Sequence, residues 1–386
     1  MCYRRLAGSL GGPPISGGMS VAVPLFPGYT LAVLWDTDDT MIPGYMQKPI
    51  FEAYGVKEGD FWNDVRASVD AYKAEGVEAN VDSVYLLTFL SWVHDGKFPG
   101  LSISKLTELG AKLEFHKGMP EALGRLQHVI EDDPRYQDAG IKVEHYIISQ
   151  GMRQLLLGTD LTKYAKKIYG SDFLEDLLPA GVASGAKPHH KPTGEITQVA
   201  NAFTSTDKTR AVFEISKGTA LDPSIGVNDA IAEEDRRIPL DQMIYVADGP
   251  TDIPVWSILN KAGGKTLAVY NPVSPSHQAR AIELEEQGRV QHVSPADFRP
   301  DGDAFKWLSF QLRQMADHIV DQVQAERAKR IQKPGGHLNA TVAKPAPKRR
   351  VAAAHREVGR PKVIQGGLAA TAAQHGARSG HGAVAL

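Results

Sequence analysis

The chain has 386 residues, of which 42% are hydrophobic and 23% charged, and its formal net charge is -2. This is an ordinary globular composition, long enough for one large domain or for a core with an inserted domain. No run of eighteen apolar residues occurs, so no membrane-spanning helix is predicted. The only cysteine is Cys2, which excludes an intrachain disulfide and a cysteine-based metal site and fits a cytoplasmic location.

The two ends of the chain differ in composition from the rest. Residues 1–18 are rich in Gly and Pro and lack the apolar stretch of a secretory signal. Between Ala325 and Leu386 there are 12 Lys or Arg residues, 2 Glu residues and no aromatic residue. We therefore expect residues 1–25 to be disordered or to be an extension before the true start site, and residues 333–386 to be a disordered basic tail. A basic tail alone is weak evidence for nucleic-acid binding, so nucleic acid is not an expected partner.

The first predicted element is a buried strand over residues 31–35 that ends in an acidic turn, Asp36-Thr37-Asp38-Asp39-Thr40. Open α/β sheets bind their ligands at the carboxyl ends of such strands. The simple interpretation is that the turn caps the next helix. The functional one is that one carboxylate attacks a substrate, the other transfers protons, and a cation offsets their charge.

A helical block follows the first strand directly. Residues 60–76 place apolar side chains three to four positions apart, and residues 81–96 are strongly apolar. This pattern predicts an inserted helical cap over residues 46–113, between core segments 26–45 and 114–332. We interpret four of its aromatic side chains as packing within the cap: Trp62, Tyr72, Phe89 and Trp92.

Strands and helices then alternate to residue 330. In chain order we expect a turn and helix over 115–133, a strand over 143–149, a helix over 152–170, loops with short strand pieces over 176–200, a helix over 206–218, strands starting at 242 and 265, a helix over 276–288 and a long closing helix over 303–330. This alternation predicts an α/β fold, with a three-layer, Rossmann-like parallel sheet core.

Later strand ends supply further polar groups. Ser149 is predicted to lie where a strand stops and a helix begins, so its hydroxyl and nearby backbone N–H groups can hold an anion. Lys208 opens a helix, and Asp248 and Asp252 bracket a turn that could complete an oxygen-ligand shell for Mg²⁺. No acidic residue or Cys stands at ligand spacing from the pair at 189–190, His-His, so we interpret it as a solvated loop pair.

In this order and spacing the chain resembles the haloacid dehalogenase superfamily, and most closely its phosphoserine-phosphatase-like branch. The matching stretches are DTDDT (36–40), IISQG (147–151), the helix with Lys208, and VADGPTD (246–252). They span the body of the chain from about residue 30 to 272.

The resemblance implies a role for each matching position. Asp36 would be the nucleophile that forms an aspartyl-phosphate, and Asp38 would protonate the leaving oxygen and then activate water. The implied substrate and phosphate site comprises Thr40, Ser149, Gln150, Gly151 and Lys208. Lys187, Lys191 and Lys217 stay open as alternatives to Lys208. The implied Mg²⁺ ligands are Asp36, Asp38 through its backbone carbonyl, Asp248, and Asp252 in support.

The resemblance is incomplete around the acidic residues. Asp39, Ala247 and Thr251 stand where relatives often carry Gly, Gly and Asn. Because Asp38 supplies a proton donor, phosphate-ester hydrolysis is favoured over dehalogenation. We expect a Mg²⁺-dependent phosphatase acting on a small phosphorylated metabolite, with a phosphotransferase or mutase, or a catalytically idle binding protein, as alternatives. The sequence predicts no oligomeric state.

Overall fold

A computed structural model describes residues 29–175 and 194–331, apart from residues 220 and 223. The predictions for residues 1–25, for the basic tail 333–386 and for the His189–His190 pair lie outside these residues. Among the described helices, none combines the length and the hydrophobicity needed to cross a bilayer.

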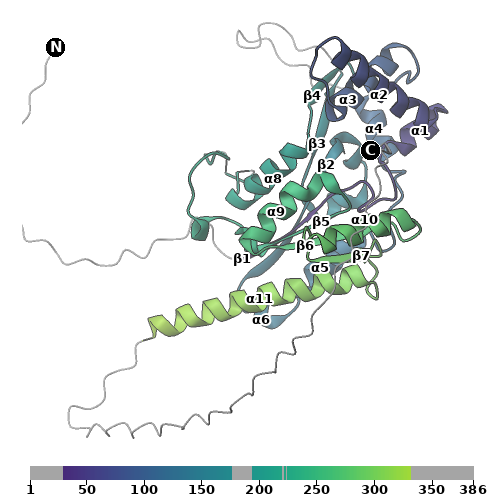
Figure 1. The fold of residues 1–386 in the computed structure, drawn as a ribbon. Coiled ribbons are helices and arrows are strands. Elements are labelled where there is room, and N and C mark those ends of the chain that lie inside the picture. The colour runs from purple at the N-terminus through teal and green to yellow at the C-terminus, as the bar shows by residue number, and fades with distance from the viewer. Residues whose placement is uncertain (1–28, 176–193, 220, 223, 332–386) are drawn as a thin grey trace, which may run out of the picture. The chain divides into compact units, whose positions relative to one another are not determined.

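A seven-stranded sheet lies at the centre of the described structure (Figure 1). Its strand order is β4-β3-β2-β1-β5-β6-β7, and every neighbouring pair is parallel except β3 and β4. The strands are β1 (Tyr29–Trp35), β2 (Ile141–Met152), β3 (Ala165–Leu174), β4 (Gln198–Asn201), β5 (Met243–Ala247), β6 (Lys265–Tyr270) and β7 (His292–Pro295).

Helices cover both faces of the sheet. Successive residues of β1 point to opposite faces, so Leu31 and Val33 belong to one hydrophobic cluster and Ala32 and Leu34 to the other. The first cluster includes residues of α1 (Lys48–Tyr54), α2 (Glu58–Ala74), α3 (Val81–His94), α4 (Ile103–Gly110), α5 (Glu121–Glu131), α6 (Pro134–Asp138), α7 (Arg153–Leu156) and α11 (Asp303–Arg330). The second includes residues of α8 (Ser205–Lys217), α9 (Ile253–Ala262) and α10 (Pro275–Glu286). This arrangement confirms the predicted three-layer, Rossmann-like α/β fold.

The predicted helix over residues 152–170 is wrong. Strand β2 continues through Ser149 to Met152, helix α7 has four residues, and residues 165–174 form β3. A single 3-10 turn (Asp160–Lys163) precedes that strand. Pairing with β2 satisfies the backbone groups of β3, and this tertiary gain overrides the local helical pattern.

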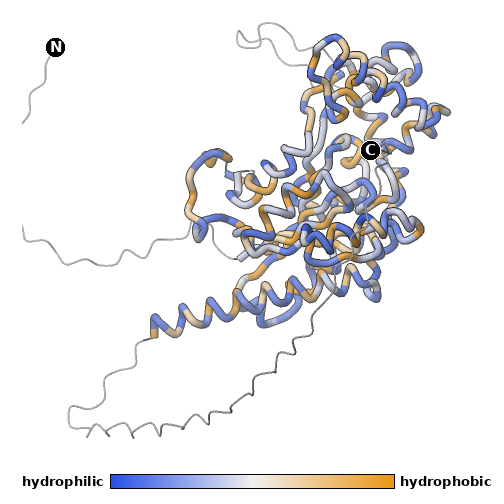
Figure 2. Tube along the Cα trace, in the orientation of Figure 1, coloured by the Kyte–Doolittle hydropathy of each residue, from blue (hydrophilic) through white to orange (hydrophobic). Residues whose placement is uncertain are grey.

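The long closing helix over residues 303–330 is confirmed as α11. Figure 2 shows hydrophobic and hydrophilic residues alternating along it. Its buried residues recur every three or four positions, among them Leu308, Leu312, Met315 and Ile319. That spacing places them on one face of the helix, which packs on the first cluster.

Helices α1 to α4 follow β1 in the chain, where the cap was expected. Phe61 and Phe89 pack with ring centroids 4.5 Å apart, and Trp92 is buried beside them. Tyr72 differs from the predicted packing within the cap, because it is 45% exposed. The ranges 46–113 for a cap and 26–45 with 114–332 for a core remain predictions, since one hydrophobic cluster runs through both.

Candidate active site

Asp36 and Asp248 meet because their strands are parallel neighbours. Strand β1 pairs with β5 in a register that sets Trp35 opposite Val246. The backbone N–H of Asp36 also donates to the carbonyl of Val246 at 2.9 Å. Asp248 comes one residue after the end of β5. Both carboxylates therefore project from the carboxyl edge of the sheet, where ligands of open α/β sheets bind.

A compact turn follows Asp36. The backbone N–H groups of Thr40, Met41 and Ile42 all donate to the carbonyl of Thr37, at 3.2, 2.8 and 3.2 Å. Thr40 is fully buried, and no hydrogen-bond partner of its hydroxyl lies within the described residues. Thr40 does not line the pocket that contains Asp36, and its predicted part in the phosphate site stays a prediction.

Asp39 has a left-handed backbone conformation, with φ of 51°. Such a conformation strains most side chains, and glycine adopts it freely. Asp39 offsets part of this cost because its Oδ1 accepts from the backbone N–H of Gly44 at 3.0 Å. The conformation explains why a small residue is expected at this position, and the hydrogen bond explains how an Asp can replace it.

Lys208 places an ammonium group inside the acidic cluster. Its Nζ lies 3.0 Å from Asp36 Oδ1 and 2.7 Å from Asp252 Oδ1, and the side chain is 1% exposed. Of the three alternatives, Lys217 lies at the other end of α8, where it donates to the backbone carbonyls of Asp229 and Val227 at 2.6 and 2.7 Å. Lys187 and Lys191 lie outside the described residues. The structure thus brings Lys208 to the predicted nucleophile.

Asp252 is fully buried behind the cluster. It accepts hydrogen bonds from Lys208, from the hydroxyl of Tyr245 and from Thr251 Oγ1 at 2.9 Å. Both of its carboxylate oxygens therefore have partners, which suits a supporting role. Tyr245 was not predicted, because a tyrosine in the middle of an apolar strand resembles ordinary core sequence.

The carboxylates of Asp36, Asp248 and Asp252 could hold a metal ion. One oxygen from each lies within 4.8 Å of the others. Three carboxylates form an oxygen donor set that matches a hard cation such as Mg²⁺. The carboxylate of Asp38 lies outside this group, and its Oδ1 accepts from the backbone N–H of Met46 at 3.0 Å.

The electrostatics of the cluster favour proton transfer by Asp38. Burial, reinforced by the Asp36 charge, raises the pKa of Asp38 to about 8. Burial also raises the pKa of Asp36, but Lys208 opposes that effect and limits it to about 6. Burial and the charge of Asp36 raise the pKa of Asp248. Burial lowers the pKa of Lys208, yet Asp252 and Asp36 outweigh burial and raise it overall. Asp38 is therefore set up as an acid and Lys208 as a permanent cation.

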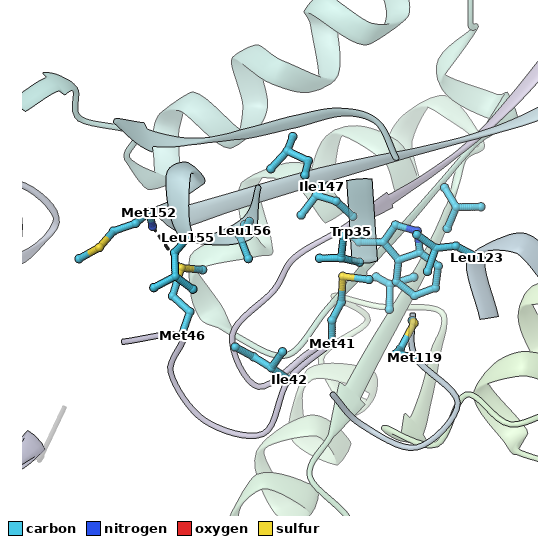
Figure 3. Close-up of a cluster of buried hydrophobic side chains, with 14 of the residues drawn as sticks. Trp35, Met41, Ile42, Met46, Met119, Leu123, Ile147, Met152, Leu155 and Leu156 are labelled. Atoms are coloured by element: carbon cyan, nitrogen blue, oxygen red, sulfur yellow. Dashed lines mark hydrogen bonds between the residues drawn. The ribbon is translucent and has the colours of Figure 1, made fainter. Parts of the chain in front are cut away.

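Met46 links the acidic turn to strand β2. Its N–H donates to Asp38, and its Sδ accepts from the N–H of Met152 at 3.1 Å (Figure 3). A Cβ added at Gly151 would lie 2.3 Å from Met46 Sδ and Cε, so the end of the buried Met46 side chain would have to move to accept it. No motif identifies Met46 in the sequence, because a methionine in this position resembles core packing.

Ser149 lies inside β2 rather than at its end. The pairing of β2 with β3 shifts register between Ile148 and Met152, so the backbone leaves the regular ladder at this point. The hydroxyl of Ser149 accepts from the N–H of Gly151 at 3.1 Å. Ser149 and Gln150 line the pocket, whereas Gly151 is buried behind it.

A pocket of about 510 Å³ contains Asp36, Asp38, Ser149, Lys208 and Asp248. Another cavity of about 590 Å³, between β3 and α8, contains none of the predicted site residues. The sequence did not reveal one wall of the site pocket, which is a face of α10 and its C-cap. The residues of this wall are His277, Arg280, Glu283, Leu284 and the C-cap Gln287. Their spacing of three to four residues in a predicted helix marks one face, but nothing in the sequence says that this face meets the acidic turn.

Comparisons with known proteins give a relative in sequence and several similar solved structures. No family model matches the chain. An uncharacterized protein of Borreliella burgdorferi is 29% identical over 283 residues, covering 72% of this chain and 95% of that protein.

Among solved structures, the chain is similar to a HAD family hydrolase of Salmonella enterica serovar Typhi (12% identity, TM-score 0.39, 70% of this chain and 68% of that one). It is also similar to a phosphoserine phosphatase in the form of a phospho-aspartyl intermediate analogue (14% identity, TM-score 0.37, 73% and 99%). At these identities and TM-scores the likeness assigns no activity to this chain.

Proposed function

We propose that this chain is a Mg²⁺-dependent phosphatase of the haloacid dehalogenase type, acting on a small phosphorylated metabolite. The observation that carries the proposal is the contact of Asp36 with Lys208 at 3.0 Å, beside Asp248 and Asp38 in one pocket. A nucleophilic carboxylate can approach a phosphate dianion only where cations offset the charge of both groups. The pocket joins a nucleophile, a cation, a metal-ligand set and a proton donor.

In the first step, a carboxylate oxygen of Asp36 attacks phosphorus, and the bond from phosphorus to the ester oxygen breaks. Asp38, whose raised pKa of about 8 keeps it protonated, gives its proton to the leaving alcohol oxygen. In the second step, water attacks the aspartyl-phosphate while Asp38 takes a proton from it. Inorganic phosphate leaves, and the Asp36 carboxylate is restored.

Charge neutralisation comes from two sources. Lys208 holds the phosphoryl oxygens beside Asp36, while the hydroxyl of Ser149 binds them from the β2 side. Mg²⁺, held by Asp36, Asp248 and the Asp38 carbonyl with support from Asp252, would supply the remaining positive charge.

The volume of the pocket also limits the size of the substrate. A volume of about 510 Å³ suits a small metabolite rather than a macromolecule. The helices of residues 46–113, interpreted as a cap, would exclude bulk water from the pocket. A phosphoserine-like or phosphorylated alcohol substrate fits this proposal.

Hydrolysis of p-nitrophenyl phosphate by the full-length chain, with and without Mg²⁺, tests the proposal. We expect metal-dependent turnover that falls by at least about 10⁴-fold in Asp36→Asn, because that variant lacks the nucleophile. The exposed Asp60→Asn is the matched control. Turnover that ignores Mg²⁺, or survives in Asp36→Asn, would contradict the proposal.

Transfer of the phosphoryl group to an alcohol instead of water would use the same intermediate. Product analysis with an added alcohol acceptor distinguishes the two outcomes. A phosphorylated acceptor would identify a phosphotransferase, and inorganic phosphate as the only product would identify a phosphatase.

A further inference from the structure

Helix α3 contacts the strand segment that carries Ser149. The hydroxyl of Tyr85 donates to the backbone carbonyl of Gln150 at 2.8 Å, and Tyr85 is 5% exposed. The side-chain amide of Gln150 donates to Asp82 Oδ2 at 3.0 Å. Asp82 and Tyr85 are three residues apart, so one face of α3 holds both the backbone and the side chain of Gln150.

The same network reaches the helix that carries Lys208. Ser171 Oγ donates to the carbonyl of Gln150 at 3.1 Å and accepts from the N–H of Phe203 at 3.0 Å. Phe203 directly precedes Thr204, the N-cap of α8. The N–H of Ser205, in the first turn of α8, lies 3.5 Å from Asp82 Oδ2.

Gln150 needs this support because of its place in the sheet. It lies within the register shift of β2, where the ladder to β3 is interrupted. Its carbonyl has two acceptor positions, and Tyr85 and Ser171 fill both. Side chains from other elements thus set the orientation of the peptide units around Gln150. These peptide units join Gln150 to Ser149 and to Gly151.

We propose that Tyr85 and Asp82 are positioning residues for the phosphoryl site, an inference that rests on the proposed function. Neither side chain lines the pocket, so neither contacts the substrate there. They act through Gln150 and the first turn of α8. In this way they fix the distance between Ser149 and Lys208. Helix α3 of the predicted cap thereby serves as a brace for the core site.

Hydrogen exchange of the full-length chain tests the brace without any need for turnover. Tyr85→Phe keeps the ring and removes only the donor. Loss of one buried hydrogen bond, worth about 1 kcal/mol, should speed exchange of the amides of residues 149–152 and 203–206 by about fivefold. Trp92→Phe is the matched control, because Trp92 lies on the same helix and donates at 2.9 Å to Asp64, outside this network.

Inhibition by inorganic phosphate tests the link to the site. In Tyr85→Phe and in Asp82→Ala, the phosphate inhibition constant of the folded protein should rise by about fivefold. This factor corresponds to the same loss of about 1 kcal/mol. Asp82→Asn keeps a carbonyl acceptor for Gln150 and should restore most of the affinity. A purely structural role would lower the melting temperature and leave the inhibition constant unchanged.

Unchanged exchange in Tyr85→Phe, or faster exchange with an unaltered phosphate inhibition constant, would overturn the inference. The same holds if Trp92→Phe weakens phosphate inhibition as much as Tyr85→Phe does. A wild-type chain without phosphatase activity would overturn the proposed function instead, and the exchange comparison would still decide whether α3 holds the segment.

Discussion

Trp35, the last residue of β1, and Asp36, the residue after it, belong to two clusters that bury polar groups in different ways. The indole N–H of Trp35 donates to Nδ1 of His145 at 3.1 Å, and Nε2 of His145 lies 2.9 Å from the carbonyl of Leu123. Because an indole can only donate, His145 is neutral, with its proton on Nε2. Every polar group of this cluster is paired, and none is charged.

One residue further on, Asp36 faces Lys208 and the other acids of the pocket. This cluster contains charges, and Asp248 has no hydrogen bond or ion pair from a side chain in the described part of the protein. A neutral, fully paired cluster stabilises the fold, while a charged and incompletely paired one costs stability and offers chemistry. The comparison predicts that perturbing the two clusters will have different consequences.

Removal of the ammonium group from the charged cluster should have the largest effect. Lys208→Met leaves the carboxylates of Asp36 and Asp252 buried without their cation, which should cost about 3–5 kcal/mol of unfolding free energy. Urea unfolding measures this loss. The exposed Lys261→Met should change stability by less than about 0.5 kcal/mol, and a similar loss in both variants would contradict the comparison.

The neutral cluster should be sensitive to acid. Burial lowers the pKa of His145 to about 4 from its ordinary value of 6.5. Between these two pH values the unfolded chain therefore binds more protons than the folded chain. The free energy of unfolding should fall by about 3 kcal/mol as the pH drops from 6.5 towards 4. His145→Gln should flatten this part of the curve of unfolding free energy against pH.

His128→Gln is the control for that pH series, since the His128 side chain is 72% exposed. It should leave the pH dependence unchanged. Equal curves for the wild type and for His145→Gln would show that the buried imidazole is not linked to acid unfolding.

Metal should stabilise the charged cluster and leave the neutral one unaffected. At a Mg²⁺ concentration about 100 times its dissociation constant, binding to the folded state adds about 2.7 kcal/mol. Thermal unfolding with and without Mg²⁺ measures this gain. Asp248→Asn should lose most of it, while the exposed Asp301→Asn should keep it. An equal gain in both variants would place the metal elsewhere.

The smallest expected effect on stability comes from a change in the packing of Met46, whose backbone N–H donates to Asp38 in the acidic turn. Gly151→Ala would place a Cβ 2.3 Å from the end of the Met46 side chain. That buried side chain would have to repack, which should cost about 1–3 kcal/mol. Gly59, in the first turn of α2, has open space around it, so Gly59→Ala is the matched control. Chemical denaturation of the two variants checks the difference.

Local patterns in the sequence predicted much of the fold. The apolar run before Asp36 and the periodic apolar residues of α11 each determine one element through short-range spacing. Residues 165–170 fall within the predicted helix over 152–170, yet they lie in β3. The pairing of β3 with β2 is a contact between two segments, and local spacing does not report it.

The candidate site divides in the same way. Asp36, Asp38 and Asp248 could be located because polar residues directly after apolar strands are conspicuous. Met46, Tyr85 and the α10 wall could not, because each resembles packing or surface sequence until the chain folds. Tyr85 reaches Gln150 across 65 residues of sequence, and no local pattern encodes such a contact.

The sequence by itself determined the α/β class, the acidic strand end and the identity of the groups available for chemistry, because these depend on neighbouring residues and on side-chain type. Tertiary structure alone decided that Lys208 contacts Asp36, that both oxygens of Asp252 are occupied and that α3 braces Gln150. The physical reason is that burial and pairing depend on the distance between side chains in space, and the order of strands in the sheet sets that distance.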